Sequence, residues 1–334
     1  MKKIFTNLSI YRLIATICIL QFHVFYLVFA RSIPFETLLS KGVQGLTALS
    51  GFLYSQKVIK DVKFFYLNNL KKILIPASIC ILFMALWNLI YMFINQSWDY
   101  FALFTSLRPY NNTPLIQIGN FYYLGYIIIC YLITPLIQRD DKWKVVGILL
   151  GLAFELTLVG IMNSPIIVIP YLVGYFVGKK AFGKYVDNET KYSFARLFIW
   201  LGILALSLGL YILNVLVPFS DGTFWIEKLQ NTYRNVILTI FGISTFFVVI
   251  YIFRFVNKYK EIKLLKYTDK LSLLIYLMNQ AFMVGAMNVT LWVEPIWAKF
   301  LVVNVITIAT SVLLEIANRY LNKWIKYPKP KLTQ

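Results

Sequence analysis

The sequence contains, at residues 9–30, the apolar run SIYRLIATICILQFHVFYLVFA, which is long enough to cross a membrane as one helix. The run includes Arg12 and His23, the only histidine of the chain. Their spacing is about three helical turns, so both side chains are expected on nearly the same face, roughly 16 Å apart along the axis. An ionisable group inside a span costs on the order of 3 kcal/mol, and its presence therefore indicates function. Taken alone, each residue has a structural explanation that fits equally well: the Arg12 side chain can snorkel to the headgroups, and His23 can make an interhelical hydrogen bond.

The composition describes a membrane protein along its whole length. Hydrophobic residues make up 59% of the chain and charged residues only 14%, and apolar runs recur throughout, which excludes a soluble domain. We expect the first run to stay in the mature protein, because it is long, contains Arg12 and lacks a small-residue cleavage site. The net charge of +19 lies in short segments between apolar runs, so it indicates topology and anionic lipid contacts rather than nucleic-acid binding.

Apolar runs of the length that crosses a bilayer, roughly 20 residues, predict an all-α polytopic membrane bundle of about ten transmembrane helices. We treat residues 1–334 as a single integral-membrane domain. The predicted spans are residues 9–30, 42–58, 73–95, 119–138, 145–161, 165–178, 197–217, 236–253, 271–289 and 296–317. Residues 57–72 mix lysines with aromatic residues, a pattern typical of a helix lying in the cytoplasmic headgroups. Residues 319–334 form a short basic tail.

Lysines and arginines divide unevenly between the two sides of this arrangement. The side of the N-terminus holds 26 of them and the other side six, while Arg12 lies inside the first span. Because basic loop residues stay in the cytoplasm, this bias predicts that both termini are cytoplasmic and favours an even number of spans. The abundance of Lys, Ile, Asn and Tyr is typical of an AT-rich bacterial genome. We therefore expect a multi-pass protein of a bacterial plasma membrane.

Most cysteines and carboxylates inside the predicted spans are explained by structural roles. Cys18, Cys80 and Cys130 lack the spacing of a metal site or a disulfide framework, so we expect packing residues and no bound metal. Glu315 is four residues before Arg319, and this spacing predicts an ion pair on one helix. For Glu155, pairing with a basic group and a role in a proton path fit equally well.

The segment GVQGLTALSGFLY, residues 42–54, places three glycines and other small residues along one predicted helix. Small residues allow a neighbouring helix to approach closely, and packing alone explains them. In combination with Arg12 and His23, however, this segment resembles the opening of the acyltransferase 3 family of integral-membrane O-acyltransferases.

Three later segments carry the same resemblance, which covers essentially the whole chain. Residues 65–76, with a basic pair and the ending Ile-Leu-Ile-Pro, look like the family's basic segment before the third span. Residues 120–135, from Asn-Phe-Tyr-Tyr-Leu to Tyr-Leu-Ile-Thr-Pro, are similar to its span with an aromatic start. Residues 272–278, SLLIYLM, look like its penultimate span. Many members have a histidine where this chain has Asn279, an amide that cannot take up a proton.

The resemblance implies transfer of an acyl group, usually acetyl from acetyl-CoA, to a hydroxyl of a sugar in a cell-surface glycan. Such a reaction needs a base or a nucleophile near neutral pH, and imidazole serves either role. His23 is therefore the candidate base or acyl carrier. Acyl-CoA is a polyanion, so Arg12, Lys71 and Lys72 are candidate contacts for its phosphates. Acetyl-CoA enters as donor substrate, and no bound cofactor is implied.

Other residues complete the predicted site. Ser50 either donates a hydrogen bond to the developing oxyanion or packs between helices, and the small residues beside it leave room for the pantetheine arm. Tyr122, Tyr123 and Asn279 are the remaining predicted substrate-binding residues. The expected partners are acyl-CoA, a surface or lipid-linked glycan, membrane lipids and polysaccharide biosynthesis proteins. Two other functions stay open: a transporter or flippase for a lipid-linked sugar, and a non-catalytic partner of a polysaccharide synthase.

Overall fold

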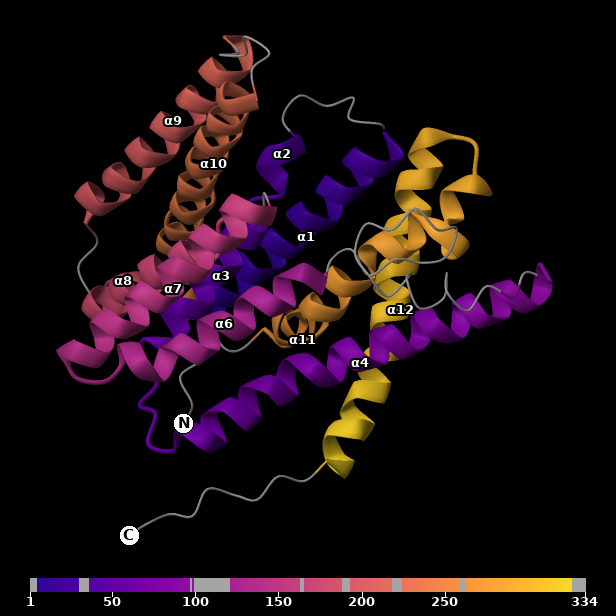
Figure 1. The fold of residues 1–334 in the computed structure, drawn as a ribbon, viewed down its shortest axis with the longest axis horizontal. Helices are drawn as coiled ribbons and strands as arrows, with labels where there is room; N and C mark the ends of the chain where they lie inside the picture. Colours follow the sequence, from indigo (N-terminus) through magenta and orange to yellow (C-terminus); the bar gives the residue numbers. More distant parts are fainter. Residues whose placement is uncertain are drawn as a thin grey trace. The chain divides into compact units, whose positions relative to one another are not determined.

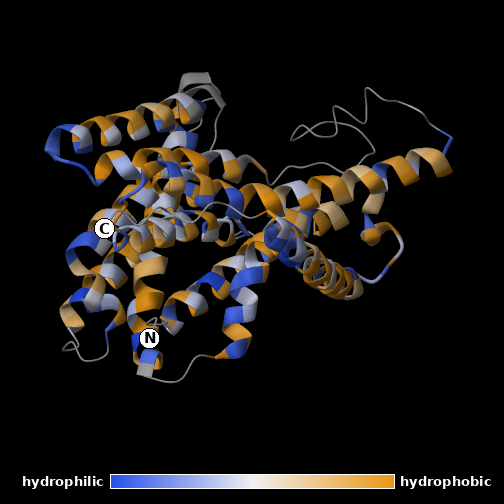
Figure 2. Ribbon diagram, turned by 90° about the horizontal axis from the view of Figure 1, so that it is seen from below, coloured by the Kyte–Doolittle hydropathy of each residue, from blue (hydrophilic) through white to orange (hydrophobic). Residues whose placement is uncertain are grey.

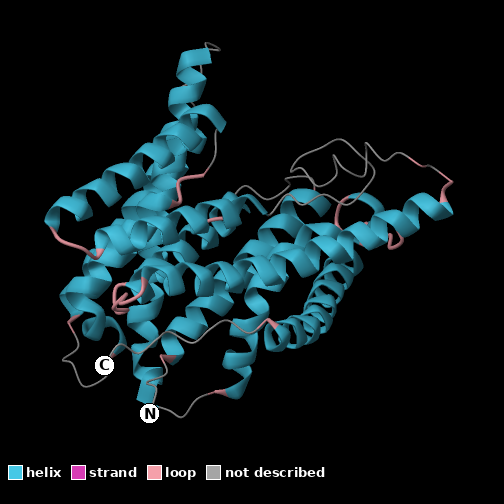
Figure 3. Cartoon of the chain, turned by 60° about the horizontal axis from the view of Figure 1, so that its bottom comes forward, coloured by secondary structure: helices cyan, strands magenta, loops and turns pink. Residues whose placement is uncertain are grey.

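The computed structural model describes residues 5–29, 36–96, 98, 121–162, 165–187, 193–217, 224–258 and 262–325. Every element within these residues is a helix or a helical turn, and no strand occurs among them (Figure 3). The predicted all-α class is therefore confirmed. Apolar residues dominate the helices, as expected for elements that bury their surface in lipid or against one another (Figure 2).

Five helical segments of the described residues are long and apolar enough to cross a membrane. They are α1 (Thr6–Val28), α4 (Val62–Ile94), α9 (Phe194–Leu216), Ile226–Asn257, which contains most of α10 (Phe224–Ile252), and α12 (Ile296–Trp324). Other predicted spans coincide with helices outside this set, namely α3 (Gly42–Tyr54), α6 (Tyr122–Ile137), α7 (Asp141–Met162) and α8 (Val168–Val186). Ten spans and two cytoplasmic termini remain predictions.

The third predicted span and the segment before it form one helix. Asp61 caps the start of α4, where its side chain accepts a hydrogen bond from the backbone N–H of Phe64 at 2.9 Å. Pro76 lies inside α4 without ending it. Most of residues 57–72 are therefore the first turns of α4, continuous with the third predicted span, and their position in the headgroups stays a prediction. In the same way, α12 continues to Trp324, so the basic tail begins as helix.

The ninth predicted span is broken in the middle. After α11 (Lys263–Met278) the chain makes three short 3-10 turns, η3 (Asn279–Phe282), η4 (Gly285–Met287) and η5 (Val289–Leu291). At Gly285 φ is 76°, a left-handed conformation that glycine adopts without a steric penalty. The prediction of one continuous helix over residues 271–289 is therefore wrong.

The helices group into two compact units, each assembled from three stretches of chain. Unit 1 comprises residues 1–18, 37–58 and 132–266. Unit 2 comprises residues 19–36, 59–131 and 267–334. The first part of α1 is described with unit 1 and its second part with unit 2.

Close contact between the backbones of α3 and α8 organises unit 1. A Cβ added at Gly51 would overlap the carbonyl oxygen of Tyr171, and one added at Gly174 would overlap the carbonyl oxygen of Ala48. The prediction that the small residues of α3 admit a neighbouring helix is therefore confirmed. In Figure 1, α9 and α10 run side by side, and α10 also packs against α3 and α8.

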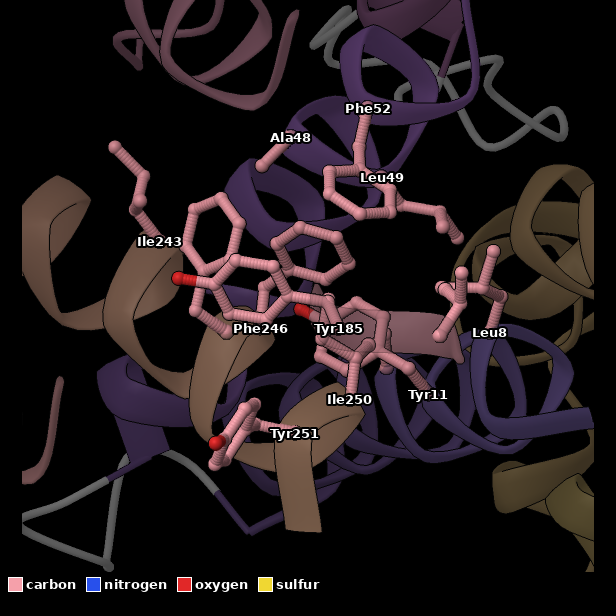
Figure 4. Packing of buried hydrophobic residues seen from close by; sticks show 13 residues of the cluster. Leu8, Tyr11, Ala48, Leu49, Phe52, Tyr185, Ile243, Phe246, Ile250 and Tyr251 are labelled. Atoms are coloured by element: carbon pink, nitrogen blue, oxygen red, sulfur yellow. The ribbon is translucent and has the colours of Figure 1, made fainter. Parts of the chain in front are cut away.

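Aromatic side chains fill the core of unit 1 (Figure 4). Phe52 of α3 lies edge-on to Phe246 of α10, with ring centroids 5.8 Å apart. Tyr185 of α8 contacts Tyr251 of α10 at 5.6 Å in the same edge-on manner. Such ring pairs add about 1 kcal/mol each beyond the burial of their area, so this core fixes α3, α8 and α10 firmly.

Polar side chains join the elements of unit 2. In this unit α4 packs against α12, and both contact the 3-10 turns after α11. The indole N–H of Trp87 on α4 donates to the carbonyl of Ala286 in η4 at 3.4 Å. The second part of α1 is linked to α12 by a hydrogen bond from the Gln21 amide to the side-chain oxygen of Asn304 at 2.9 Å.

Candidate functional site

The local geometry of His23 defines which ring nitrogen is available for chemistry. His23 is 8% exposed, and its Nδ1 lies 2.9 Å from the carbonyl oxygen of Ile19, one turn earlier on α1. A carbonyl oxygen can only accept a hydrogen bond, so Nδ1 carries the proton. In the neutral ring Nε2 then holds a lone pair, and it makes no hydrogen bond within the described residues. This is the tautomer that a base or nucleophile acting through Nε2 requires.

The helical register turns His23 away from α12. Gln21 bonds to Asn304 of α12, and the ring of Phe25 stacks on that of Phe300 with centroids 6.3 Å apart. His23 lies two residues from each, about 200° around the helix, and therefore on the opposite face of α1. The contacts with α12 thus hold the second part of α1 without using the face that carries the imidazole.

Arg12 shares the helix of His23 but belongs to the other unit. Because α1 is continuous over Thr6–Val28, the predicted register holds and the two residues share a face of the helix. Arg12 is partly buried in unit 1, and its backbone carbonyl accepts a hydrogen bond from the Thr16 hydroxyl at 2.8 Å. The other predicted site residues divide between the two units. Ser50 belongs to unit 1, and the residues that belong to unit 2 are His23, Lys71, Lys72, Tyr122, Tyr123 and Asn279.

Lys71 and Lys72 differ in their surroundings although they are adjacent. The ammonium group of Lys71 donates to the carbonyl oxygens of Asn322 at 3.3 Å and Ile325 at 2.5 Å, at the C-terminal end of α12. Lysine there satisfies carbonyls that the helix leaves without partners and offsets the negative end of its dipole. Lys72 is exposed. The structure thus gives Lys71 a capping contact and leaves Lys72 as the more accessible of the two cations.

Two tyrosines and Asn279 mark the end of α11. The ring of Tyr123 on α6 meets that of Tyr276 on α11 edge-on, with centroids 5.4 Å apart. Asn279 is fully buried and begins the first 3-10 turn, three residues beyond Tyr276. Tyr123 is therefore placed beside the helix end that carries Asn279, as a shared site requires. The side chain of Tyr122 lies outside the described residues.

The break after α11 is the feature of this region that the sequence prediction missed. Irregular backbone at membrane depth is tolerated where it is buried in protein or lines a cavity, because lipid cannot satisfy its polar groups. Polar residues within a predicted apolar span, among them Asn279, Gln280 and Asn288, together with Gly285, were the available signal. They indicate a site more often than a plain span does.

The Ser50 hydroxyl makes its hydrogen bond within its own helix. It donates to the carbonyl of Leu46 at 3.0 Å, a bond within α3. The side chain is partly buried beside the Gly51 contact with α8. This geometry is that of a packing residue, and an oxyanion contact would require the hydroxyl to rotate away from Leu46.

The buried carboxylates of Glu315 and Glu155, both inside predicted spans, have structural partners. Glu315 accepts from Arg319 Nε at 3.1 Å and from the Asn318 amide at 2.7 Å, which confirms the predicted ion pair. Glu155 on α7 accepts from the backbone N–H groups of Ile167 and Ile169, each at 2.8 Å. Glu155 therefore holds the start of α8, where backbone N–H groups have no helical partners.

Cysteine and metal-ligand geometry add no further chemistry to the described residues. Cys18, Cys80 and Cys130, all in the described part of the chain, form no disulfide there, and the latter two are buried, in agreement with a packing role. No group of three or more His, Cys, Asp or Glu side chains in the described ranges is arranged to hold a metal ion.

Comparison with known proteins identifies one family. Residues 5–316, nearly the whole chain, match the family model of an acyltransferase domain. No curated protein and no solved structure matches the chain. The match spans both units, so neither of them is an addition to the domain.

Proposed function

Since the chain belongs to the acyltransferase 3 family of membrane acyltransferases, we propose that it transfers an acetyl group from acetyl-CoA to a sugar hydroxyl of a cell-surface or lipid-linked polysaccharide. The observation that carries the proposal is the tautomer of His23. Its Nδ1–H is donated to Ile19, which leaves Nε2 unprotonated in the neutral ring. We place this reaction in a bacterial plasma membrane.

His23 serves the transfer in one of two ways. As a base, Nε2 takes the proton of the sugar hydroxyl while its oxygen attacks the acetyl carbonyl; the C–S bond breaks and CoA leaves as a thiolate that receives the proton. As a carrier, Nε2 attacks the carbonyl first and CoA leaves as a thiolate; the sugar oxygen then takes the acetyl group from the ring, and the hydroxyl proton passes through the freed Nε2 to the CoA thiolate. In both routes Nε2 of His23 is the reacting nitrogen. The acetyl group moves from CoA to the sugar, and the hydroxyl proton ends on CoA.

The remaining predicted residues bind the two substrates. Lys72 and Arg12 contact the phosphates of acetyl-CoA, and Lys71 adds to this charge from its position at the end of α12. Tyr123 and Asn279, beside the end of α11, contact the acceptor sugar by ring stacking and amide hydrogen bonds. Because Asn279 is not a proton acceptor, proton transfer rests on His23.

The test is label transfer by the purified full-length protein. We incubate it with radiolabelled acetyl-CoA and glycan from cells that lack the protein, and we compare the wild type with His23→Gln. The variant should lose roughly 10²- to 10⁴-fold in rate, the usual contribution of a positioned base. Label retained on quenched protein without acceptor supports the carrier route, and its absence supports the base route. Acetylation at an unchanged rate in His23→Gln would contradict the proposal.

A matched variant separates chemistry from packing. Gln21→Met removes the hydrogen bond to Asn304 on the opposite face of the same helix and leaves the imidazole in place. Its rate should stay within about tenfold of the wild type, because a packing bond of this kind contributes about 1 kcal/mol. A flippase predicts no covalent transfer of label from either protein. A non-catalytic partner of a synthase predicts that His23→Gln restores polysaccharide production in deleted cells.

A further inference from the structure

Unit 1 contains a cavity that the proposed reaction does not use. It has a volume of about 160 Å³ and lies between the first part of α1, the start of α3 and the middle of α10. Tyr11, Ala15, Cys18 and Phe241 supply much of its apolar wall. An apolar cavity of about 150 Å³ stays dry and takes up a molecule as bulky as benzene. The space therefore suits a segment of hydrocarbon chain.

Lys41, at the edge of this cavity, introduces a positive charge. A Cβ added at Gly242 on α10 would lie 2.8 Å from the carbonyl oxygen of Lys41, so this glycine lets the backbone of Lys41 approach α10. Burial, and then the charge of Arg234, lower the pKa of Lys41 to about 8. Lys41 thus combines a partly buried amine with a cationic neighbour.

Arg234 is fixed in place near Lys41. Its guanidinium lies 5.8 Å from the ring centroid of Tyr211, and the Tyr211 hydroxyl is 2.6 Å from that of Thr37, four residues before Lys41. Arg234 precedes Phe241 by two helical turns, so the two lie on one face of α10, roughly 10 Å apart along the axis. Within the described residues neither Lys41 nor Arg234 has an ion pair with a carboxylate.

From this arrangement we propose that unit 1 binds an anionic membrane phospholipid, with its phosphate at Lys41 and Arg234 and a chain segment in the cavity. Lys41 and Arg234 have no carboxylate partner among the described residues and attract an anion, and the cavity that Lys41 lines has a mostly apolar wall. A glycerophospholipid supplies a phosphate and an acyl chain in one molecule. The distance between its phosphate and the first part of its acyl chain matches the roughly 10 Å between Arg234 and the cavity wall at Phe241. This binding does not depend on the proposed acetyl transfer.

Photocrosslinking of the full-length protein in phosphatidylcholine nanodiscs tests the proposal. The probe is a trace lipid with a diazirine in its acyl chain, either phosphatidylglycerol or phosphatidylcholine, and labelled peptides are mapped by mass spectrometry. Phosphatidylglycerol should label the cavity peptides of α1, α3 and α10 well above phosphatidylcholine. Lys41→Gln and Arg234→Gln should each lower this labelling about fivefold, the contribution of one basic residue to anionic lipid binding. Equal labelling by the two lipids would overturn the proposal.

Control variants keep the result interpretable. Lys41→Arg retains the charge and should retain labelling, whereas Cys18→Phe fills the cavity and should abolish labelling of its wall. Lys299→Gln, a cation of unit 2 on α12, should change nothing. Each variant is checked by its thermal midpoint, so loss through misfolding is recognised. Undiminished labelling of the cavity wall in Cys18→Phe contradicts the proposal.

Competition identifies the source of the phosphate. Excess inorganic phosphate should fail to displace the labelled lipid, because it leaves the cavity empty. Displacement by phosphate alone would mean a free-anion site, and selective displacement by an equimolar polyprenyl phosphate would mean an isoprenoid lipid. Either result would overturn the assignment to a glycerophospholipid.

Discussion

Units 1 and 2 differ in how closely their helix backbones approach one another, although side-chain hydrogen bonds join helices in both. In unit 1, α3 and α8 meet backbone to backbone at Gly51 and Gly174, with an aromatic core beside them. In unit 2, side-chain hydrogen bonds such as those of Gln21 and Lys71 connect α1, α4 and α12. Small-residue contacts and polar bonds are the two main ways in which helices associate in lipid, where burial gives little drive. The same chain thus shows both, and they should respond differently to substitution.

The largest effect is expected where backbones touch. Gly51→Leu adds a side chain against the Tyr171 carbonyl, which cannot move without displacing α8. We expect a loss of about 3 kcal/mol or more in the free energy of unfolding and little folded protein after purification. Gly209→Leu on α9 is the matched control, because a Cβ there meets no atom within 4 Å. Thermal unfolding monitored by size-exclusion chromatography measures both, and equal midpoints would refute the backbone contact.

The Glu155 carboxylate joins α7 to the start of α8 inside unit 1. Its substitution tests whether polar contacts stabilise this unit as well as its glycine contacts do. Glu155→Ala leaves the N–H groups of Ile167 and Ile169 buried without their acceptor, at a cost of about 2 kcal/mol. Glu155→Gln keeps one side-chain oxygen and should lose about half as much. The thermal midpoints of the two variants provide the measurement. A normal midpoint for Glu155→Ala would contradict the role of this carboxylate at the start of α8.

Much of this arrangement was predictable, because it depends on composition and on residue spacing. The all-α class, the close approach at the small residues of α3 and the Glu315–Arg319 pair all follow from patterns within one segment. The membership of the family likewise followed from motifs spread along the chain.

Features that depend on contacts between distant segments were not predictable. Mean hydropathy stays high through residues 271–289, so hydropathy alone does not detect where α11 stops, and Asn279, Gln280 and Gly285 are the local signal of the break. The turns there are held by Trp87 of α4 and by α12. Lys71 bonds to Ile325, and Lys41 approaches Gly242, across large separations in sequence. The donor and acceptor roles of His23 also required the position of its ring relative to Ile19.

The adjacent Lys71 and Lys72 allow a polar contact within unit 2 to be compared with an exposed cation. The expected change in stability is smaller than for Glu155. Lys71→Gln removes the ammonium from the carbonyls of Asn322 and Ile325 and should lower stability by about 1 kcal/mol. Lys72→Gln should leave stability nearly unchanged and raise the KM for acetyl-CoA, because the residue is exposed. Thermal midpoints and acetyl-CoA titrations of both variants separate the two roles. If the variants behave alike, the assigned difference between them is wrong.

The pH dependence of stability tests the position of Lys41, a cation within the glycine-packed unit. Its pKa is lowered to about 8 from an ordinary 10.5, so between these pH values the unfolded chain binds a proton that the folded chain has released. The free energy of unfolding should therefore rise with pH across this window, and Lys41→Gln should remove that part of the rise. Competitive labelling with an amine reagent gives the pKa directly, through the pH at which Lys41 is half reactive. Arg234→Gln should move this pH upward only modestly, because burial lowers the pKa of Lys41 more than the neighbouring charge does. A half-reactive pH near 10.5 in the wild type would mean that water reaches Lys41 freely, and that the close packing of unit 1 ends before the start of α3.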